Sequence, residues 1–210
     1  SPHHTISDAA LVGGGTVPQP GEISLAHNGV LFLDELPEFQ RSVLEVMRQP
    51  LEDRVVTISR ARLSVEYPSS LMLVASMNPC PCGNYGSEQL ACECTALQIR
   101  NYQRKISGPM LDRIDIQITV PRETYETINN QKSKESSQHI REKVISARTK
   151  QLKRFNQDST KTNSIISSRK IKTHCTTTPE AQQLLRQVIN KHHLSARSYH
   201  KILKIAQTIA

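Results

Sequence analysis

Apolar residues in the first part of the chain form short runs that predict strands, with helical and loop segments between them. The runs at 30–33 and 71–76 are continuous, as expected for strands buried on both faces of a parallel sheet. Apolar residues at helical spacing predict a helix over about 38–50. Alternating patterns predict a hairpin with strands at 55–58 and 63–67, and a further strand at 116–120.

From residue 122 onward the pattern is helical. One helix is predicted by residues that recur along a single face with one polar break: Ile140, Val144, Ala147, Gln151 and Phe155. Thr178, which precedes Pro179, and Ser195 are typical caps of two further helices. The polar stretch 157–173 predicts a mobile loop. The pattern therefore predicts an α/β part followed by an all-helical part.

Charge divides the chain at the same place. Residues 1–121 hold 9 Lys and Arg against 13 Asp and Glu, a net charge of −4. Residues 122–210 hold 18 against 6, a net charge of +12. We therefore expect a domain boundary near Pro121. The basic part suits binding to nucleic acid phosphates, and solvated faces of amphipathic helices explain its lysines equally well.

Hydropathy argues against a membrane protein. No apolar stretch approaches the roughly 20 residues that a spanning helix needs. The N-terminus, Ser-Pro-His-His, lacks the basic region and apolar core of a signal peptide. We therefore expect a soluble, cytoplasmic protein without a membrane partner. Because the first residue is not Met, we also expect a piece of a longer protein.

Two acids, Asp34 and Glu35, directly follow the first apolar run. Ligands of open α/β sheets bind at the carboxyl ends of the strands, and buried charges are costly unless they are paired or metal-bound. This pattern predicts that Asp34 holds a hydrated Mg²⁺ and that Glu35 polarises a water for attack on a phosphate. Asn78 lies just beyond the second run and could orient a water or a phosphate oxygen beside them. The alternatives are two solvated acids and an ordinary turn-forming asparagine.

Four cysteines then follow in one loop with the spacing C-x-C…C-x-C: Cys80, Cys82, Cys92 and Cys94. Structural Zn²⁺ takes four ligands in a tetrahedral shell, and in a cytosolic chain such a group favours a metal over disulfides. Because C-x-C is less typical of zinc sites than C-x-x-C, free thiols remain an equal alternative. Cys175 has no partner in the sequence, so we expect an isolated thiol there.

Basic residues mark the turn of the predicted hairpin. Arg60 and Arg62 lie at its tip. If the hairpin protrudes, these two side chains could contact nucleic acid phosphates. An exposed turn with two solvated arginines is an equal alternative.

Two further arginines have more than one interpretation. Arg113 lies among acids and could form a structural ion pair with Asp112 or Asp115. Arg197 falls in the first turn of the last predicted helix, where the helix dipole disfavours a cation. An external anion or an acidic partner would explain Arg197, and a surface arginine is the alternative.

Several short motifs, taken together, resemble one family over nearly the whole chain. They are Ser-Pro-His-His-Thr-Ile-Ser at 1–7, Pro-Gly-Glu-Ile-Ser-Leu-Ala-His at 20–27, Leu-Phe-Leu-Asp-Glu-Leu-Pro-Glu-Phe at 31–39, Asn-Pro-Cys-Pro-Cys-Gly at 78–83, Gly-Pro-Met-Leu-Asp-Arg-Ile-Asp at 108–115 and Leu-Ser-Ala-Arg at 194–197. This set resembles the magnesium-chelatase-like AAA+ ATPases of the ComM/YifB type. The likeness is densest in residues 1–121.

The resemblance implies a role for each matching residue. Asp34 and Glu35 look like the Walker B pair, and Asn78 is similar to sensor 1. Arg113 looks like the arginine finger that reaches the nucleotide of a neighbouring subunit, which implies a homo-oligomeric ring, expected to be a hexamer. Arg197 resembles sensor 2. The implied cofactors are ATP and Mg²⁺.

The same resemblance implies a fold and a biological activity. Residues 1–121 would be the C-terminal part of an AAA+ αβα core, with a parallel sheet and a hairpin insertion that points into the ring pore. Residues 122–210 would be a basic, all-helical lid. ComM-type proteins act as helicases on DNA in natural transformation and recombination, where they drive branch migration. The relatives in chlorophyll synthesis power magnesium insertion instead.

One motif of the family is missing from these residues. No Gly-x-x-x-x-Gly-Lys-Ser/Thr phosphate-binding loop occurs in the 210 residues. We therefore expect the chain alone not to hydrolyse ATP, because the cradle for the phosphates is absent. Two other functions stay open: a magnesium-chelatase-like ATPase acting on a protein partner, and a non-catalytic, zinc-stabilised module that binds nucleic acid.

Overall fold

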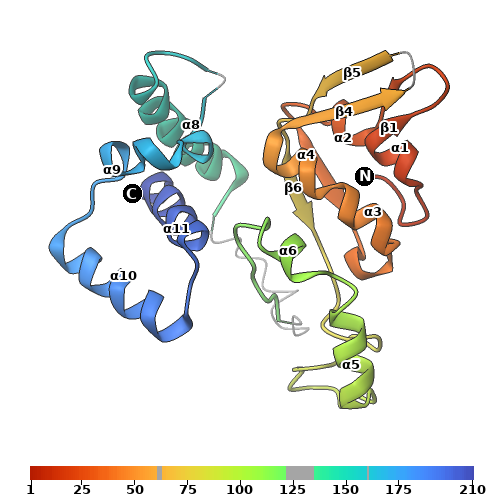
Figure 1. The fold of residues 1–210 in the computed structure, drawn as a ribbon. Coiled ribbons are helices and arrows are strands. Elements are labelled where there is room, and N and C mark those ends of the chain that lie inside the picture. The colour runs from red at the N-terminus through yellow and green to blue at the C-terminus, as the bar shows by residue number, and fades with distance from the viewer. Residues whose placement is uncertain (61–62, 122–134, 160) are drawn as a thin grey trace. The chain divides into compact units, whose positions relative to one another are not determined.

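A computed structural model describes residues 1–60, 63–121, 135–159 and 161–210 (Figure 1). The chain forms two compact units, Ser1–Arg122 and Glu123–Ala210, which are described separately. The first is mixed α/β with a small parallel sheet, and the described part of the second is helical. None of the described helices combines the length and the apolar character required to cross a membrane.

Short elements open the N-terminal unit. The helices α1 (Asp8–Val12) and α2 (Glu22–Leu25) pack against each other beside an antiparallel ladder of β1 (Gly13–Gly14) and β2 (Gln19–Pro20). Ser7 caps α1 by accepting a hydrogen bond from the Ala10 amide at 3.2 Å. Gly21 cannot carry a side chain, because a Cβ there would lie 2.5 Å from the carbonyl oxygen of Leu11.

The central sheet pairs β3 (Val30–Leu33) with β6 (Met72–Ala75) in parallel, with Leu33 opposite Ala75. Both strands lie where the apolar runs predict them. Burial alternates along β3, however: Leu31 and Leu33 are buried, whereas Val30 and Phe32 are exposed. The expectation of strands buried on both faces is therefore wrong, because in the described structure only one face of this sheet packs on the core.

The predicted helix over 38–50 is three shorter elements instead: η1 (Leu36–Glu38), α3 (Arg41–Val46) and α4 (Arg48–Asp53). The break lies at Met47. Pro50 does not end the helix but occupies the third position of α4. A first-turn residue needs no amide hydrogen, so proline is tolerated there.

The hairpin prediction is confirmed. β4 (Val55–Arg60) and β5 (Leu63–Pro68) pair antiparallel, with Arg60 opposite Leu63 in the last pair before the turn. Val56 and Ile58 are buried in the unit's core. Figure 1 shows the hairpin extending beyond the helices α1 and α2. The core is formed by apolar side chains of α1, α2, β3, α3 and β4 and of residues next to them: Leu11, Ile23, Leu31, Leu33, Leu36, Phe39, Val43, Leu44, Met47, Val56, Ile58, Ile106 and Met110.

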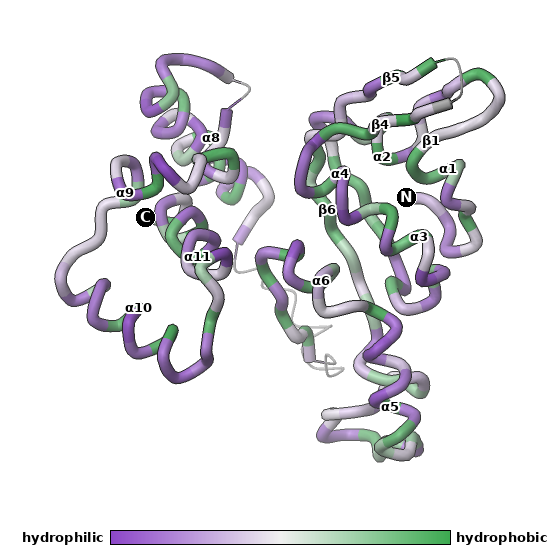
Figure 2. The backbone as a smooth tube through the Cα atoms, viewed as in Figure 1, coloured by the Kyte–Doolittle hydropathy of each residue, from purple (hydrophilic) through white to green (hydrophobic). Residues whose placement is uncertain are grey.

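Two helices complete the unit, α5 (Ala96–Gln103) and α6 (Gly108–Leu111). The strand predicted at 116–120 is not formed, and Ile116, Ile118 and Val120 are exposed. In Figure 2 the segment that follows α6 shows the alternation of hydrophobic and hydrophilic residues behind that prediction. Alternation alone does not make a strand, because a strand also needs a partner, and within the described residues no strand pairs with 116–120.

The described C-terminal unit consists of helices: α8 (Ser137–Arg154), η2 (Asn163–Ile165), η3 (Ser168–Lys170), α9 (Ile171–His174), α10 (Pro179–His192) and α11 (Ala196–Ile209). Thr178 and Ser195 cap α10 and α11 as predicted, each accepting a hydrogen bond from an amide three residues on. On α11, Leu203 is buried, whereas Ile209 at the end of the helix is exposed.

Two predictions for this unit are corrected. The stretch 157–173 is not a simple mobile loop, because Ile166 and Ile171 are buried in a small core with Cys175 and Leu203. On α8, Ile140 and Val144 are exposed, whereas the polar Gln151 is buried and its side-chain oxygen accepts from the Asn163 amide at 3.1 Å. Figure 2 shows α8 as largely hydrophilic with short hydrophobic segments.

Candidate functional site

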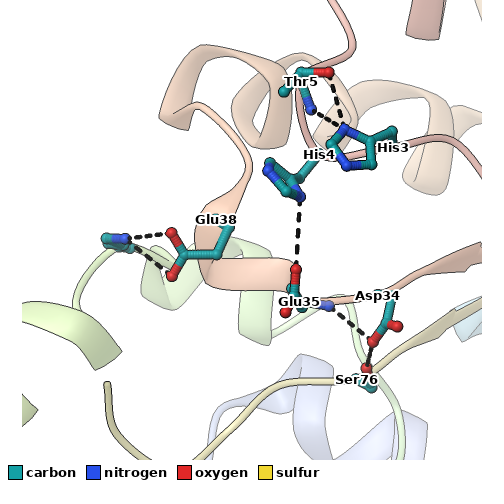
Figure 3. Close-up of polar contacts among 8 residues, drawn as sticks. His3, His4, Thr5, Asp34, Glu35, Glu38 and Ser76 are labelled. Carbon is teal, nitrogen blue, oxygen red and sulfur yellow. Dashed lines mark hydrogen bonds and ion pairs between the residues drawn. The ribbon is translucent and has the colours of Figure 1, made fainter. Parts of the chain in front are cut away.

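The two acids stand at the carboxyl end of β3, beside the end of β6. The Ser76 amide donates to the Leu33 carbonyl at 3.0 Å, so the parallel register continues past the strands and sets Asp34 opposite Ser76. The Ser76 hydroxyl donates to Oδ1 of Asp34 (Figure 3). Because both groups are exposed, Asp34 and Ser76 present a pair of oxygen ligands at the sheet edge predicted to bind a ligand.

Glu35 has an unusual backbone conformation. Its φ of 52° and ψ of 48° lie in the left-handed region, which costs a residue with a side chain about 1–2 kcal/mol. The Glu35 amide donates to Oδ1 of Asp34 at 3.0 Å, and buried Leu33 and Leu36 anchor the chain on either side. Strain of this kind is concentrated at functional sites, where the surrounding structure enforces it.

His4 lies against Glu35, although it is far away in the sequence. Nδ1 of His4 is 3.6 Å from Oε2 of Glu35 (Figure 3). The centre of the His4 ring lies 4.0 Å from that of His3, with the rings tilted by 33°, and His4 meets Phe39 edge-on at 6.4 Å. Sequence reasoning missed both His4 and Ser76 as site residues. Ser76 follows Ala75 at the end of one apolar run, as Asp34 follows Leu33 at the end of the other, so an alignment of the two runs could have identified Ser76. For His4, the two consecutive histidines were the only signal in the sequence.

Asn78 lies at the same edge of the sheet, two residues beyond Ser76, and is exposed. The main chain of Asn78 interacts with the hydroxyl of Tyr102, a buried residue of α5. Burial raises the pKa of Tyr102, and the negative charges of Glu38 and Glu35 add to this effect. Asn78 therefore sits near the acids, but Ser76 is the residue that contacts Asp34.

Arg113 is held inside its own unit. Its Nε donates to the carbonyl of Arg48 at 3.1 Å, its Nη1 donates to the carbonyl of Pro109 at 2.6 Å, and its Nη2 forms an ion pair with Glu52. The side chain is only 14% exposed. Arg113 therefore forms its ion pair with Glu52 of α4, rather than with Asp112 or Asp115. Sequence reasoning could not find this partner, because 61 residues separate the two.

The other predicted arginines lie elsewhere. Arg197 is exposed in the first turn of α11, in the C-terminal unit. Arg60 occupies the last position of β4. Arg62 lies outside the described residues. The structure thus brings together Asp34, Glu35 and the region of Asn78.

The four-cysteine loop forms a compact cluster. The sulfurs of Cys80, Cys82, Cys92 and Cys94 all lie within 4.8 Å of one another, so the group could hold a metal ion such as zinc. Backbone hydrogen bonds from Asn84 and Glu93 lower the pKa of Cys82 to about 6. A backbone hydrogen bond from Cys94 acts in the same direction on Cys92, but loss of hydration and the neighbouring thiols outweigh it and raise the pKa of Cys92 to about 12.

Comparison with known proteins identifies two family matches that together cover most of the chain. Residues 1–128 match the model for magnesium chelatase, subunit ChlI, and residues 134–210 match the model for its C-terminal part. The competence protein ComM of Haemophilus influenzae is 45% identical over 211 aligned positions, which cover 100% of this chain and 40% of that protein.

Other relatives give the same picture. The uncharacterized protein YifB of Escherichia coli is 42% identical, with 100% of this chain and 40% of that protein covered. A magnesium-chelatase 67 kDa subunit of Chlorobaculum parvum is 33% identical over 72 residues, 34% of this chain and 12% of that protein. The chain thus spans about two fifths of the length of the ComM and YifB proteins that it matches. By its sequence and by the family models that it matches, this chain belongs to the magnesium chelatase ChlI family.

Proposed function

We propose that this chain supplies the magnesium- and water-binding half of a nucleotide site in a ring-forming AAA+ ATPase that acts on DNA. The observation that carries the proposal is the end of β3. There Asp34 is hydrogen-bonded to Ser76, and Glu35 is held in a strained left-handed conformation beside it. Membership of the magnesium chelatase family supports an ATPase assignment for the protein that contains these residues.

The residues present fit a magnesium ion. Mg²⁺ in nucleotide sites is bound by one or two carboxylates, by hydroxyl or water oxygens and by the phosphates themselves. Asp34 offers an exposed carboxylate with the Ser76 hydroxyl next to it, which is an all-oxygen donor set. When bound, the ion would neutralise charge on the β- and γ-phosphates. Asp34 and Ser76 are the residues that would hold it.

Glu35 is the residue that would orient and polarise the attacking water. Its side chain is 58% exposed, and the backbone that carries it is fixed by buried neighbours. His4, at 3.6 Å, limits the directions in which this carboxylate can point. We therefore assign His4 as a positioning residue for Glu35 and keep Asn78 as the polar group next along the edge.

The two arginines fit this proposal in different ways. Arg113 can act on the nucleotide of a neighbouring subunit only if it breaks its ion pair with Glu52 and contacts the phosphates instead. Ring assembly would thus compete with an existing internal contact. Arg197 stands on the lid unit, in the first turn of α11, in keeping with the sensor 2 role that the family likeness implies.

DNA is the proposed substrate because of the positive charge of residues 122–210 and because of the name of one relative. Residues 122–210 carry a net charge of +12, and the β4–β5 hairpin has Arg60 in its last pair before the turn. A protein named for competence is 45% identical to this chain over 211 aligned residues. If phosphate contacts dominate, binding should weaken steeply with salt, by about 10³-fold or more between 50 and 200 mM for six contacts.

The test is ATP turnover by the full-length protein that contains this chain. Glu35→Gln should lower kcat by about 10²- to 10⁴-fold, the contribution of a general base, while nucleotide binding persists. The matched control is Glu38→Gln. Glu38 is three residues away and pairs with Lys105 at 3.2 Å, outside the proposed site, so turnover should be unchanged. Equal losses in both variants would overturn the assignment of Glu35. We also expect residues 1–210 alone to show no turnover.

The DNA part of the proposal has its own measurement. Single-stranded and branched DNA should each stimulate turnover, and sedimentation of the protein with ATP should show a closed ring, expected to be a hexamer. Turnover that ignores both DNA forms and is stimulated by a protein partner would replace DNA with the chelatase-like alternative.

A further inference from the structure

The cysteine cluster takes no part in the nucleotide site, yet its geometry is specific. Sγ of Cys80 lies 3.4 Å from that of Cys82 and 3.7 Å from that of Cys92, and the Cys82 and Cys92 sulfurs are 3.6 Å apart. A tetrahedral shell with Zn–S bonds of about 2.3 Å places its sulfurs about 3.8 Å apart. The observed spacings are close to that value.

Neither disulfides nor the hydrophobic core accounts for this convergence. Disulfide sulfurs lie about 2.05 Å apart, and all four cysteines are free. From 81 to 94 the chain contains no helix or strand, and Tyr85 and Leu90 are exposed. Ordering each residue of such a segment costs about 1–2 kcal/mol of backbone entropy. A loop without a core therefore needs another source of stabilisation, and four converging sulfurs offer one.

The backbone around the first pair supports thiolate ligands. The Gly83 amide donates to the Cys80 carbonyl at 3.1 Å, in a turn where Gly83 has a φ of 80°. The Tyr85 amide donates to the Cys80 sulfur at 3.3 Å. Amide hydrogen bonds of this kind orient a ligating sulfur and stabilise its negative charge.

We propose that Cys80, Cys82, Cys92 and Cys94 bind one Zn²⁺ as a closed, structural tetrathiolate centre. A tetrahedral set of four sulfurs is selective for zinc or iron among biological metals, and such sites leave no open position for catalysis. The thiols release their protons to solvent when the ion binds. Cys175 belongs to the other unit and takes no part.

The centre would fix the chain at both ends of the loop. Cys80 comes two residues after Asn78. Cys94 directly precedes Thr95, which caps α5 in a reciprocal capping box with Gln98. The far end of α5 returns to the start of the loop, where Gln103 Nε2 donates to the Pro79 carbonyl at 3.2 Å. We therefore infer that zinc, through this closed path, holds Asn78 at the edge of the nucleotide site; this step rests on the proposed function.

Metal analysis of the freshly purified, reduced protein tests the site without reference to ATP. We expect about one zinc per chain, falling below about 0.2 in Cys92→Ser and unchanged in the matched control Cys175→Ser. Replacement by Co²⁺ in the unmodified protein should give the visible bands of a tetrahedral thiolate complex. Less than about 0.2 zinc per chain in the unmodified protein, or iron in its place, overturns the zinc site.

Turnover by the full-length protein tests the second step. Removal of zinc by a chelator should lower kcat several-fold with little change in the KM for ATP, and added Zn²⁺ should restore it. An unchanged kcat in the zinc-free protein overturns the link to Asn78 but leaves the metal site standing. Absence of turnover in the zinc-loaded protein contradicts the proposed function instead, so the two failures are distinguishable.

Discussion

Glu35 holds a backbone conformation that glycine adopts at no steric cost, yet the chain places a glutamate there. Such a choice is expected where the carboxylate is needed and stability is given up for it. The same conformation points the side chain away from the core, toward His4. At the scale of the residue, strain and proposed function therefore coincide.

Replacement of Glu35 separates strain from chemistry. Glu35→Gly and Glu35→Ala both remove the carboxylate, but only glycine relieves the left-handed conformation. We expect Glu35→Gly to be the more stable of the two by about 1 kcal/mol, as measured by urea unfolding of the chain. An alanine variant as stable as the glycine variant would show that position 35 is not strained.

The sequence indicated site residues only where their chemistry was local. Asp34 and Glu35 stand out because acids directly follow an apolar run. Ser76 acquires its meaning only from the register between β3 and β6, and His4 only from the folding of the N-terminal segment onto Glu35. Contacts between residues so distant in the sequence leave no periodic signal.

At the scale of elements, Arg113 links the end of α6 to α4. It satisfies two backbone carbonyls and the carboxylate of Glu52 while being largely buried. Loss of the guanidinium would remove two hydrogen bonds to backbone carbonyls and the ion pair with Glu52. An arginine dedicated only to a neighbouring subunit would leave the stability of the single chain unaffected.

Arg113→Ala should therefore destabilise the isolated chain by about 1–3 kcal/mol in chemical unfolding. Arg113→Lys should recover only part of this, because an ammonium cannot reproduce the guanidinium fork. The matched control is Lys161→Ala, which removes an exposed pair with Asp158 at 2.7 Å and should change stability by less than about 0.5 kcal/mol. If the Arg113→Ala chain were as stable as the unmodified chain, Arg113 would have no stabilising role within its own unit. The proposed role as an arginine finger would then be the only one left.

Element boundaries show where pattern reasoning stops. Hydrophobic spacing located the apolar face of 38–50 but did not show that the segment is divided into separate helices. That division depends on a break at Met47 and on Pro50 in the first turn of α4. At 116–120 the alternation was read correctly, and the strand is still absent from the described structure. Pairing is a property of two segments, whereas a pattern describes only one.

At the scale of the whole molecule, two independent divisions of the chain agree closely. The structure separates Ser1–Arg122 from Glu123–Ala210, and the family models match residues 1–128 and 134–210. Each unit has its own core, one formed around β3 and the hairpin and the other around Ile171 and Leu203. Polar groups enter the second core through Gln151 and Asn163, which hydrogen-bond to each other, and spacing alone did not predict this burial.

Folding order follows from the position of the β4–β5 hairpin. The parallel pair β3–β6 must close a long connection, and the hairpin lies within it. A hairpin forms in about 1–10 μs, before a pairing of such separation. Once formed, the hairpin shortens the flexible connection between β3 and β6 by about a third. This lowers the entropic cost of closing that connection by only about 0.4 kcal/mol. Burial of Val56 and Ile58 in the common core is therefore the larger contribution.

The hairpin should thus act as a folding nucleus for the sheet that carries Asp34. Ile58→Ala is expected to slow refolding in stopped-flow measurements, whereas Met110→Ala, equally buried but beyond β6, should mainly speed unfolding. Equal effects on both rates would contradict this order. The β4–β5 hairpin would then also determine how quickly the end of β3 that carries Asp34 forms after synthesis.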